Sequence, residues 1–255
     1  MKTEIIYFET PEMNNPVLIE GLPGVGNVGR VTIAYLIEKL NAKKFAELYT
    51  PYFFPLVIVN SNSEIQPLKI EFYYYKGEKD LIFMIGDSQP VEYEGYYKVC
   101  EKILDLCDKF GVKEIITVGG FGIGIEKEKP MVLGALTDLS ELEKYKKLGV
   151  HFEEENPIGS IFGISGLLLG LAKKRGLKGC SMLGETIGYP IITDPKAAEE
   201  VIKVLMNLFN LKVDLKDLVK NIKQLEAFLK SIEEKTKQLT QQLQQKPKNY
   251  TDYIG

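Results

Sequence analysis

Short runs of hydrophobic residues alternate with segments of helical period from residue 17 to about residue 210. This alternation is typical of an α/β domain with a largely parallel sheet, because parallel strands are buried on both faces and are joined by helices. We therefore expect one α/β core domain. The predicted strands are 17–20, 56–60, 69–75, 81–86, 114–118, 131–136, 150–153 and 179–184.

Four helices are predicted between these strands, each with a single hydrophobic stripe. They cover residues 28–40, 94–110, 161–174 and 195–209. The last has the clearest start, because Asp194 is a good N-cap and Pro195 suits the first helical turn. These four helices would cover the two faces of the sheet.

After residue 211 the composition changes, and glycine is absent until the final residue. Hydrophobic residues recur at alternating spacings of three and four, which predicts a coiled-coil-like helix of roughly 46 Å at about 1.5 Å per residue. This helix would pack on the preceding helix, on a second copy, or back over its own domain. Its expected contact residues are Leu215, Leu218, Ile222, Leu225, Leu229 and Ile232. The predicted organisation is a core at 1–212, a projecting helix at 213–246 and a flexible anchoring tail at 247–255.

Composition narrows the functional classes. The 255 residues include 32 Lys+Arg and 35 Asp+Glu, a formal net charge of −3, and no basic block. Nucleic-acid binding by phosphate neutralisation is therefore not expected. The longest apolar stretch, 157–172, is too short and too rich in glycine for a membrane span, and the N-terminus lacks the features of a signal peptide. Three cysteines in apolar stretches are expected to be reduced, so we predict a cytoplasmic protein.

A glycine-rich loop follows the first predicted core strand. Gly24, Gly26 and Gly29 match the dinucleotide pattern G-x-G-x-x-G between a strand and a helix. However, the first glycine comes too late after the strand, and no acidic residue ends a clear second strand about 20 positions later. The favoured interpretation is a tight turn with close helix-to-sheet packing, whose helix N-terminus could hold an anion or a carbonyl.

Further loops follow other strands at their carboxyl ends, where open α/β sheets bind ligands. Asp87 and Ser88 follow one strand, Gly119 to Gly124 another, and Glu185 a third. A cleft formed by Gly24, Gly26, Gly29, Asp87 and Glu185 is the basis of an enzyme hypothesis, in which Asp87 and Glu185 act as a carboxylate pair. The alternative is a structural role, in which both carboxylates cap turns and accept hydrogen bonds from loop amides. No zinc cluster or serine elbow supports catalysis, and no metal or cofactor is expected.

Five of these segments together resemble the archaeal and bacterial homologues of proteasome assembly chaperone 2, over residues 15 to 230. They are Glu20 to Gly29, Gly86 to Pro90, Gly119 to Phe121, Gly184 to Pro190 and Thr193 to Ala198. The resemblance implies an α/β core similar to the purine nucleoside phosphorylase fold and assembly into a homo-oligomer such as a tetramer. It also implies an ATP-independent assembly chaperone or activator acting on the 20S proteasome, not an enzyme.

Proteins of this kind dock on proteasome α-subunits through a C-terminal tripeptide of a hydrophobic residue, tyrosine and any residue. The resemblance therefore implies that Tyr250, Tyr253, Ile254 and Gly255 contact the α-ring. The sequence departs from the pattern by one position, since Tyr253 is third from the end and Ile254 is penultimate. Two alternatives remain: a small-molecule hydrolase or phosphorylase using the glycine-lined cleft, and a general holdase chaperone.

Overall fold

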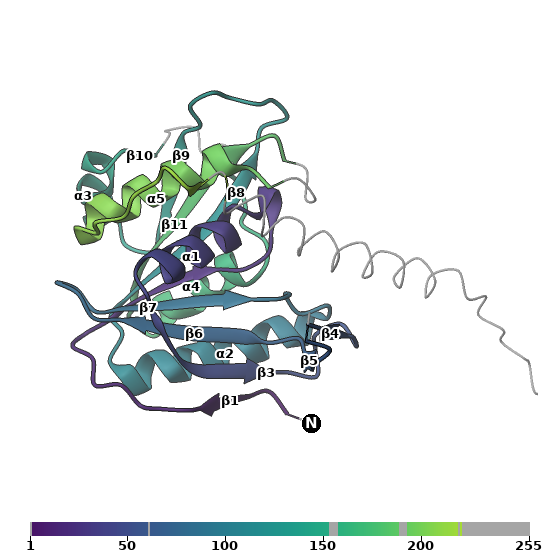
Figure 1. The fold of residues 1–255 in the computed structure, drawn as a ribbon. Helices are drawn as coiled ribbons and strands as arrows, with labels where there is room; N and C mark the ends of the chain where they lie inside the picture. Colours follow the sequence, from purple (N-terminus) through teal and green to yellow (C-terminus); the bar gives the residue numbers. More distant parts are fainter. Residues whose placement is uncertain (1, 61, 153–157, 189–192, 219, 221–255) are drawn as a thin grey trace, which may run out of the picture.

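Nine strands form one sheet in the order β1-β3-β6-β7-β2-β8-β11-β9-β10. This computed structural model describes residues 2–60, 62–152, 158–188, 193–218 and 220 (Figure 1). A separate hairpin pairs β4 with β5. The strands are β1 Glu4–Tyr7, β2 Val17–Gly21, β3 Lys43–Tyr49, β4 Val57–Val59, β5 Ile65–Pro67, β6 Ile70–Tyr75, β7 Leu81–Gly86, β8 Glu114–Gly122, β9 Val132–Leu136, β10 Val150–His151 and β11 Lys178–Thr186.

Helices cover both faces of this sheet. In Figure 1, α1 and α5 lie in front of the sheet, and α2 and α4 lie behind it. The four long helices confirm the predicted ones to within three residues at each end, and Asp194 accepts a hydrogen bond from the Ala197 N–H as the predicted cap. The helices are α1 Val28–Lys39, α2 Tyr93–Phe110, α3 Leu142–Lys147, α4 Ile164–Lys174 and α5 Pro195–Phe209, with 3-10 turns η1 Val25–Asn27 and η2 Leu139–Glu141.

Alternation along the buried strands divides the core into two layers. In β2, Val17 and Ile19 pack with α1 and α5, whereas Leu18 packs with α2 and α4. Successive side chains of a strand point to opposite faces, so an uninterrupted hydrophobic run supplies both layers. This pattern explains why the central strands could be located from sequence.

The prediction of a largely parallel sheet similar to the purine nucleoside phosphorylase fold is wrong, because the sheet is mixed. Strands β7, β2, β8 and β11 are parallel neighbours, but β1, β3, β6 and β7 form antiparallel pairs, as do β9 and β11. The physical reason is visible between β6 and β7. The connection at residues 76–80 is far too short for a crossover helix, so these two strands must run in opposite directions.

The prediction of a long C-terminal helix that begins at residue 213 is also wrong for the described part of the chain. The chain from 211 to 215 has no regular structure, and residues 216–217 form a turn. This segment returns to the core: the Tyr35 hydroxyl donates to the Asp214 carbonyl at 2.6 Å, Leu215 packs against the layer of α1 and α5, and Leu218 is fully buried there. The described residues contain no long coiled-coil helix, and the expected contact residues Ile222, Leu225, Leu229 and Ile232 lie outside them.

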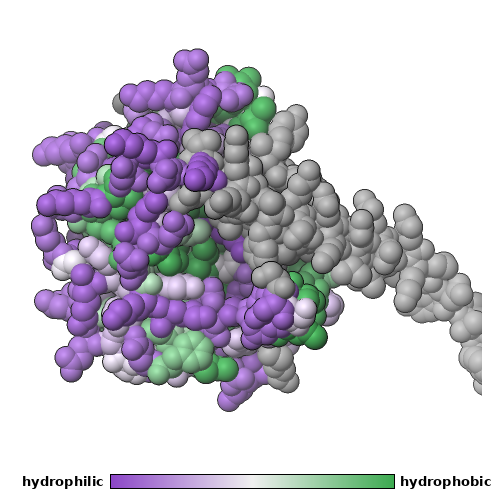
Figure 2. Space-filling model, in the orientation of Figure 1, coloured by the Kyte–Doolittle hydropathy of each residue, from purple (hydrophilic) through white to green (hydrophobic). Residues whose placement is uncertain are grey.

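One end of the sheet is left open on the α1 face. There Lys44 and Glu47 of β3 lie beside Lys69 and Glu71, and the four side chains form ion pairs of 2.6 to 3.1 Å. Figure 2 shows mostly hydrophilic side chains across the part of this face below α1, where β6 and β3 lie. This half of the face therefore carries a polar cluster, whereas α1 and α5 cover the other half.

Candidate functional site

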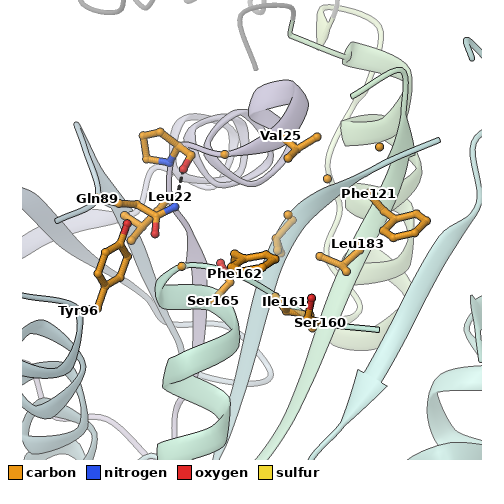
Figure 3. A pocket seen from close by; sticks show the side chains of 17 residues that line it. Leu22, Val25, Gln89, Tyr96, Phe121, Ser160, Ile161, Phe162, Ser165 and Leu183 are labelled. Atoms are coloured by element: carbon orange, nitrogen blue, oxygen red, sulfur yellow. Dashed lines mark hydrogen bonds between the residues drawn. The ribbon is translucent and has the colours of Figure 1, made fainter. Parts of the chain in front are cut away.

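A cavity of about 370 Å³ lies at the carboxyl edge of the parallel strands β2, β8 and β11. Five segments distant in sequence meet there (Figure 3), which brings Gln89 and Tyr96 to one side and Leu183 and Phe121 to the other, with 160–163 between them. Its volume lies at the lower end of the range of small-molecule sites, roughly 300–1,000 Å³. Its lining comprises Leu22, Pro23, Gly24, Val25, Gln89, Tyr96, Val118, Gly119, Gly120, Phe121, Gly122, Ser160, Ile161, Phe162, Gly163, Ser165 and Leu183.

Gln89 fixes the position of two walls of this cavity. Its Nε2 donates to the Pro23 carbonyl at 2.7 Å (Figure 3). Its Oε1 accepts from the Ile164 N–H at 2.9 Å. The side chain thus connects the loop before α1 to the first turn of α4. Both ends of the amide are engaged, so Gln89 is a positioning residue for the walls.

The three glycines predicted to form the cleft have different places. Gly24 lines the cavity. Gly26 has a positive φ of 60° and faces Thr186, and a Cβ at Gly29 would lie 2.2 Å from the Val118 carbonyl oxygen. Gly29 is therefore where α1 meets β8 backbone to backbone, a contact that a side chain would prevent.

Neither predicted carboxylate lines the cavity. The Asp87 carboxylate pairs with Arg30 at 3.4 Å and accepts from the Lys69 N–H, and burial raises its pKa although Arg30 opposes the change. The Glu185 carboxylate is 5% exposed, pairs with Lys127 at 2.8 Å and accepts from the Met131 N–H. The structure therefore places the two carboxylates in separate ion pairs that hold loops.

Glu20 interacts with two residues of the cavity lining, Leu22 and Ser165, and was not predicted as a site residue. It is fully buried, and its Oε1 accepts from the Leu22 N–H at 3.0 Å. Burial raises its pKa to about 7, whereas the hydroxyl of Ser165, which lines the cavity, and the Leu22 N–H lower it in part. The signal in the sequence was an acidic residue ending a strand that is otherwise entirely hydrophobic.

The tail residues Tyr250, Tyr253, Ile254 and Gly255 lie outside the described residues. Within the described ranges, no group of three or more His, Cys, Asp or Glu side chains is placed to hold a metal ion. None of the described helices has the length and apolar content that a bilayer crossing requires. Cys100, Cys107 and Cys180 are buried free thiols whose pKa values burial raises.

Comparison with known proteins gives one consistent result. The model of the PAC2 family matches residues 18–233. The chain is 34% identical to the uncharacterized protein MJ1210 of Methanocaldococcus jannaschii, over 95% of this chain and 93% of the relative.

Solved structures from Pyrococcus furiosus are also similar. PbaB, described as an archaeal proteasome activator, is 40% identical with a TM-score of 0.81, over 91% of this chain and 99% of PbaB. PbaA, described as an archaeal homolog of proteasome-assembly chaperone, is 28% identical with a TM-score of 0.76, over 93% of this chain and 99% of PbaA.

Proposed function

Because this chain belongs to the PAC2 family, we propose that it is an assembly chaperone or activator of the archaeal 20S proteasome. The observation that carries this proposal is the similarity to PbaB, at 40% identity over 99% of that chain. The similarity to PbaA supports the same class of partner. The proposed role is binding, not catalysis, and its place is the cytoplasm.

The proposal includes action without ATP. It is supported by the packing role of the glycine-rich loop, which accounts for the glycines without a bound nucleotide. A Cβ at Gly29 or at Gly120 would lie 2.2 Å from a backbone carbonyl oxygen, of Val118 and Val25 respectively. Packing between α1 and β8 is therefore a sufficient reason for the pattern that resembles a nucleotide loop.

We further propose that the protein docks on the α-ring through Tyr250, Tyr253, Ile254 and Gly255. A short peptide provides one weak site, and a homo-oligomer would present several copies to one ring at a high effective concentration. Tails that bind better to an open gate or to an assembling ring would favour that state through their differential affinity alone. Oligomerisation is therefore part of the proposed mechanism.

The enzyme alternative has weaker support. A hydrolase or phosphorylase at the carboxyl edge was expected to use Asp87 and Glu185, but both carboxylates are held in ion pairs outside the cavity. Of the five predicted cleft residues, only Gly24 lines the cavity.

The test is peptide hydrolysis by purified archaeal 20S proteasome, without ATP, in the presence and absence of this protein. We expect faster hydrolysis, which is lost when residues 248–255 are deleted. A matched variant with residues 248, 249, 251 and 252 replaced by glycine and serine, and with Tyr250, Tyr253, Ile254 and Gly255 retained, should keep the effect. No acceleration and no co-migration with α-rings would contradict the proposal, and acceleration by the deletion variant would exclude the tail.

A further inference from the structure

Three polar side chains form a continuous row inside the sheet. Thr117 of β8 is the register partner of Glu20 in β2 and of Ser181 in β11, and register partners point to the same face. This face is the one that α2 and α4 cover, since Leu18 and Ile115 on the same face pack in their layer. All three polar residues are 0% exposed.

The row contains polar atoms that the protein does not satisfy. Glu20 Oε2, Thr117 Oγ1 and Ser181 Oγ are buried without a hydrogen bond of good geometry among the described residues, although the Ser165 hydroxyl is close enough to the Glu20 carboxyl to lower its pKa in part. Each such atom costs about 1–3 kcal/mol, and native proteins contain few of them. Three such atoms on adjacent strands make this row a candidate place for a bound polar group.

This row lies directly below the cavity. Two positions further along the same strands, and on the same face, Leu22, Gly119 and Leu183 line the cavity. The Glu20 carboxyl reaches the level of this lining, because it accepts from the N–H of Leu22 itself. Gly119 has no side chain, and the neighbour nearest to its Cβ position is Leu183 Cδ2 at 3.1 Å, the end of a flexible side chain that an entering group would displace.

The walls above this floor are hydrophobic and aromatic. Tyr96, Phe121, Ile161 and Phe162 surround the cavity, and Ser165 reaches it from the first turn of α4 (Figure 3). The site therefore combines aromatic walls with one buried carboxyl group. When this group is ionised, its oxygens can only accept hydrogen bonds.

We propose that this cavity binds a small primary amine with a compact aromatic or aliphatic body, and that the ammonium group passes Gly119 to pair with Glu20. A buried carboxylate is stabilised when a cation donates hydrogen bonds to it, and the ammonium group has three donors to offer Glu20, Thr117 and Ser181. The aromatic walls bury the apolar body of the ligand. This site is independent of the proposed proteasome role.

Binding of such a ligand depends on pH through Glu20. The pKa of this carboxyl is about 7 in the free protein, so the binding-competent ionised form is a minor species at pH 6. From α2 the titratable group that interacts with Glu20 is the Cys100 thiol, whose pKa burial raises to about 12, so it stays neutral. Ser165 from α4 and Thr117 and Ser181 from the neighbouring strands do not titrate.

The experiment is calorimetric titration of the full chain with 2-phenylethylamine, and with 2-phenylethanol as the neutral analogue. At pH 8 we expect the amine to bind at least tenfold more tightly than the alcohol. At pH 6 its affinity should fall about tenfold, because only about a tenth of Glu20 is ionised.

Two variants test the position of the ligand. Glu20→Gln should weaken amine binding at least tenfold, whereas the matched control Glu126→Gln, an exposed carboxylate paired with Lys196, should not change it. Gly119→Ala leaves Glu20 in place but adds a methyl group 3.1 Å from Leu183 Cδ2, and should also weaken binding. The proposal is overturned if the amine does not bind, if the alcohol binds as tightly, or if Glu20→Gln or Gly119→Ala binds like the wild type.

Discussion

Gly29 and Val118 lie so close that a Cβ atom on the glycine would be 2.2 Å from the valine carbonyl oxygen. Because the neighbour is backbone in the middle of β8, it cannot move aside as a flexible side chain would. This contact places the start of α1 against the centre of the sheet, and with it the loop that lines the cavity.

The first prediction follows from this contact. Gly29→Ala should lower the free energy of unfolding by about 3 kcal/mol or more, because the added methyl group separates α1 from β8. Gly170→Ala is the matched control: Gly170 lies in α4 with no atom near its Cβ position, so alanine should stabilise the protein by up to about 1 kcal/mol. Urea unfolding of both variants checks this. Equal midpoints for Gly29→Ala and the wild type would contradict the close contact.

The second prediction concerns the buried Glu20. Its pKa rises on folding from 4.5 to about 7, so between these pH values the folded protein binds more protons than the unfolded chain. Stability must then fall as pH rises through this window, by a total on the order of 3 kcal/mol. Glu20→Gln should lack this contribution, and should be more stable than the wild type at pH 8 while differing little at pH 4.5.

The measurement is urea unfolding of both proteins from pH 4.5 to 8, compared as the difference between them, so that other titrating groups cancel. A difference that does not change with pH would show that Glu20 stays ionised in the folded protein. A variant that gains stability and loses amine binding would show that the buried carboxyl is kept for binding and not for folding.

The third prediction has the opposite sign and concerns Glu47. Burial alone would raise the pKa of this carboxyl, but hydrogen bonds from Lys44, Lys69 and Tyr49 outweigh it and lower the pKa to about 2. The stabilisation that these partners provide is complete above about pH 4.5 and is lost as pH falls toward 2. Glu47→Gln should therefore be destabilising at pH 7 and much less so at pH 3. Unfolding midpoints at both pH values test this, with the exposed Glu143→Gln as a control that should change little.

The central strands could be predicted from sequence because each is a hydrophobic run that supplies both core layers. Strand β3 could not, since Glu47 and two lysines interrupt its pattern. Besides Lys44 and Tyr49 of its own strand, the buried Glu47 is paired with Lys69, which lies next to β6, the neighbour of β3 in the sheet. That contact joins positions 22 residues apart and is not visible in local periodicity.

The carboxyl edge was predicted as a ligand site from its loops, yet the residues chosen there were mostly not those that line the cavity. Asp87 and Glu185 stand out as carboxylates in loops, but their partners Arg30 and Lys127 come from other segments. The row of Glu20, Thr117 and Ser181 depends on strand order and register, which pair β2 with β8 and β8 with β11. Neither property can be obtained from one strand's own sequence.

The last prediction concerns Leu218, which the heptad spacing assigned to the hydrophobic stripe of a projecting helix and the structure places in the core. Leu218 is 0% exposed and packs with the layer of α1 and α5, and the nearby Lys39–Asp217 ion pair and the Tyr35–Asp214 hydrogen bond hold the same segment against α1. Leu218→Ala should therefore lower the free energy of unfolding by about 2–5 kcal/mol through the cavity that it leaves.

The same variant should leave the size of any oligomer unchanged, because a residue buried within its own domain cannot contact another copy. Urea unfolding and light scattering after size exclusion measure the two effects, and the exposed Leu139→Ala serves as a control that should alter neither. A Leu218→Ala protein with wild-type stability and a smaller oligomer would support the heptad interpretation instead. Loss of stability at constant oligomer size would show that Leu218 belongs to the core of its own domain.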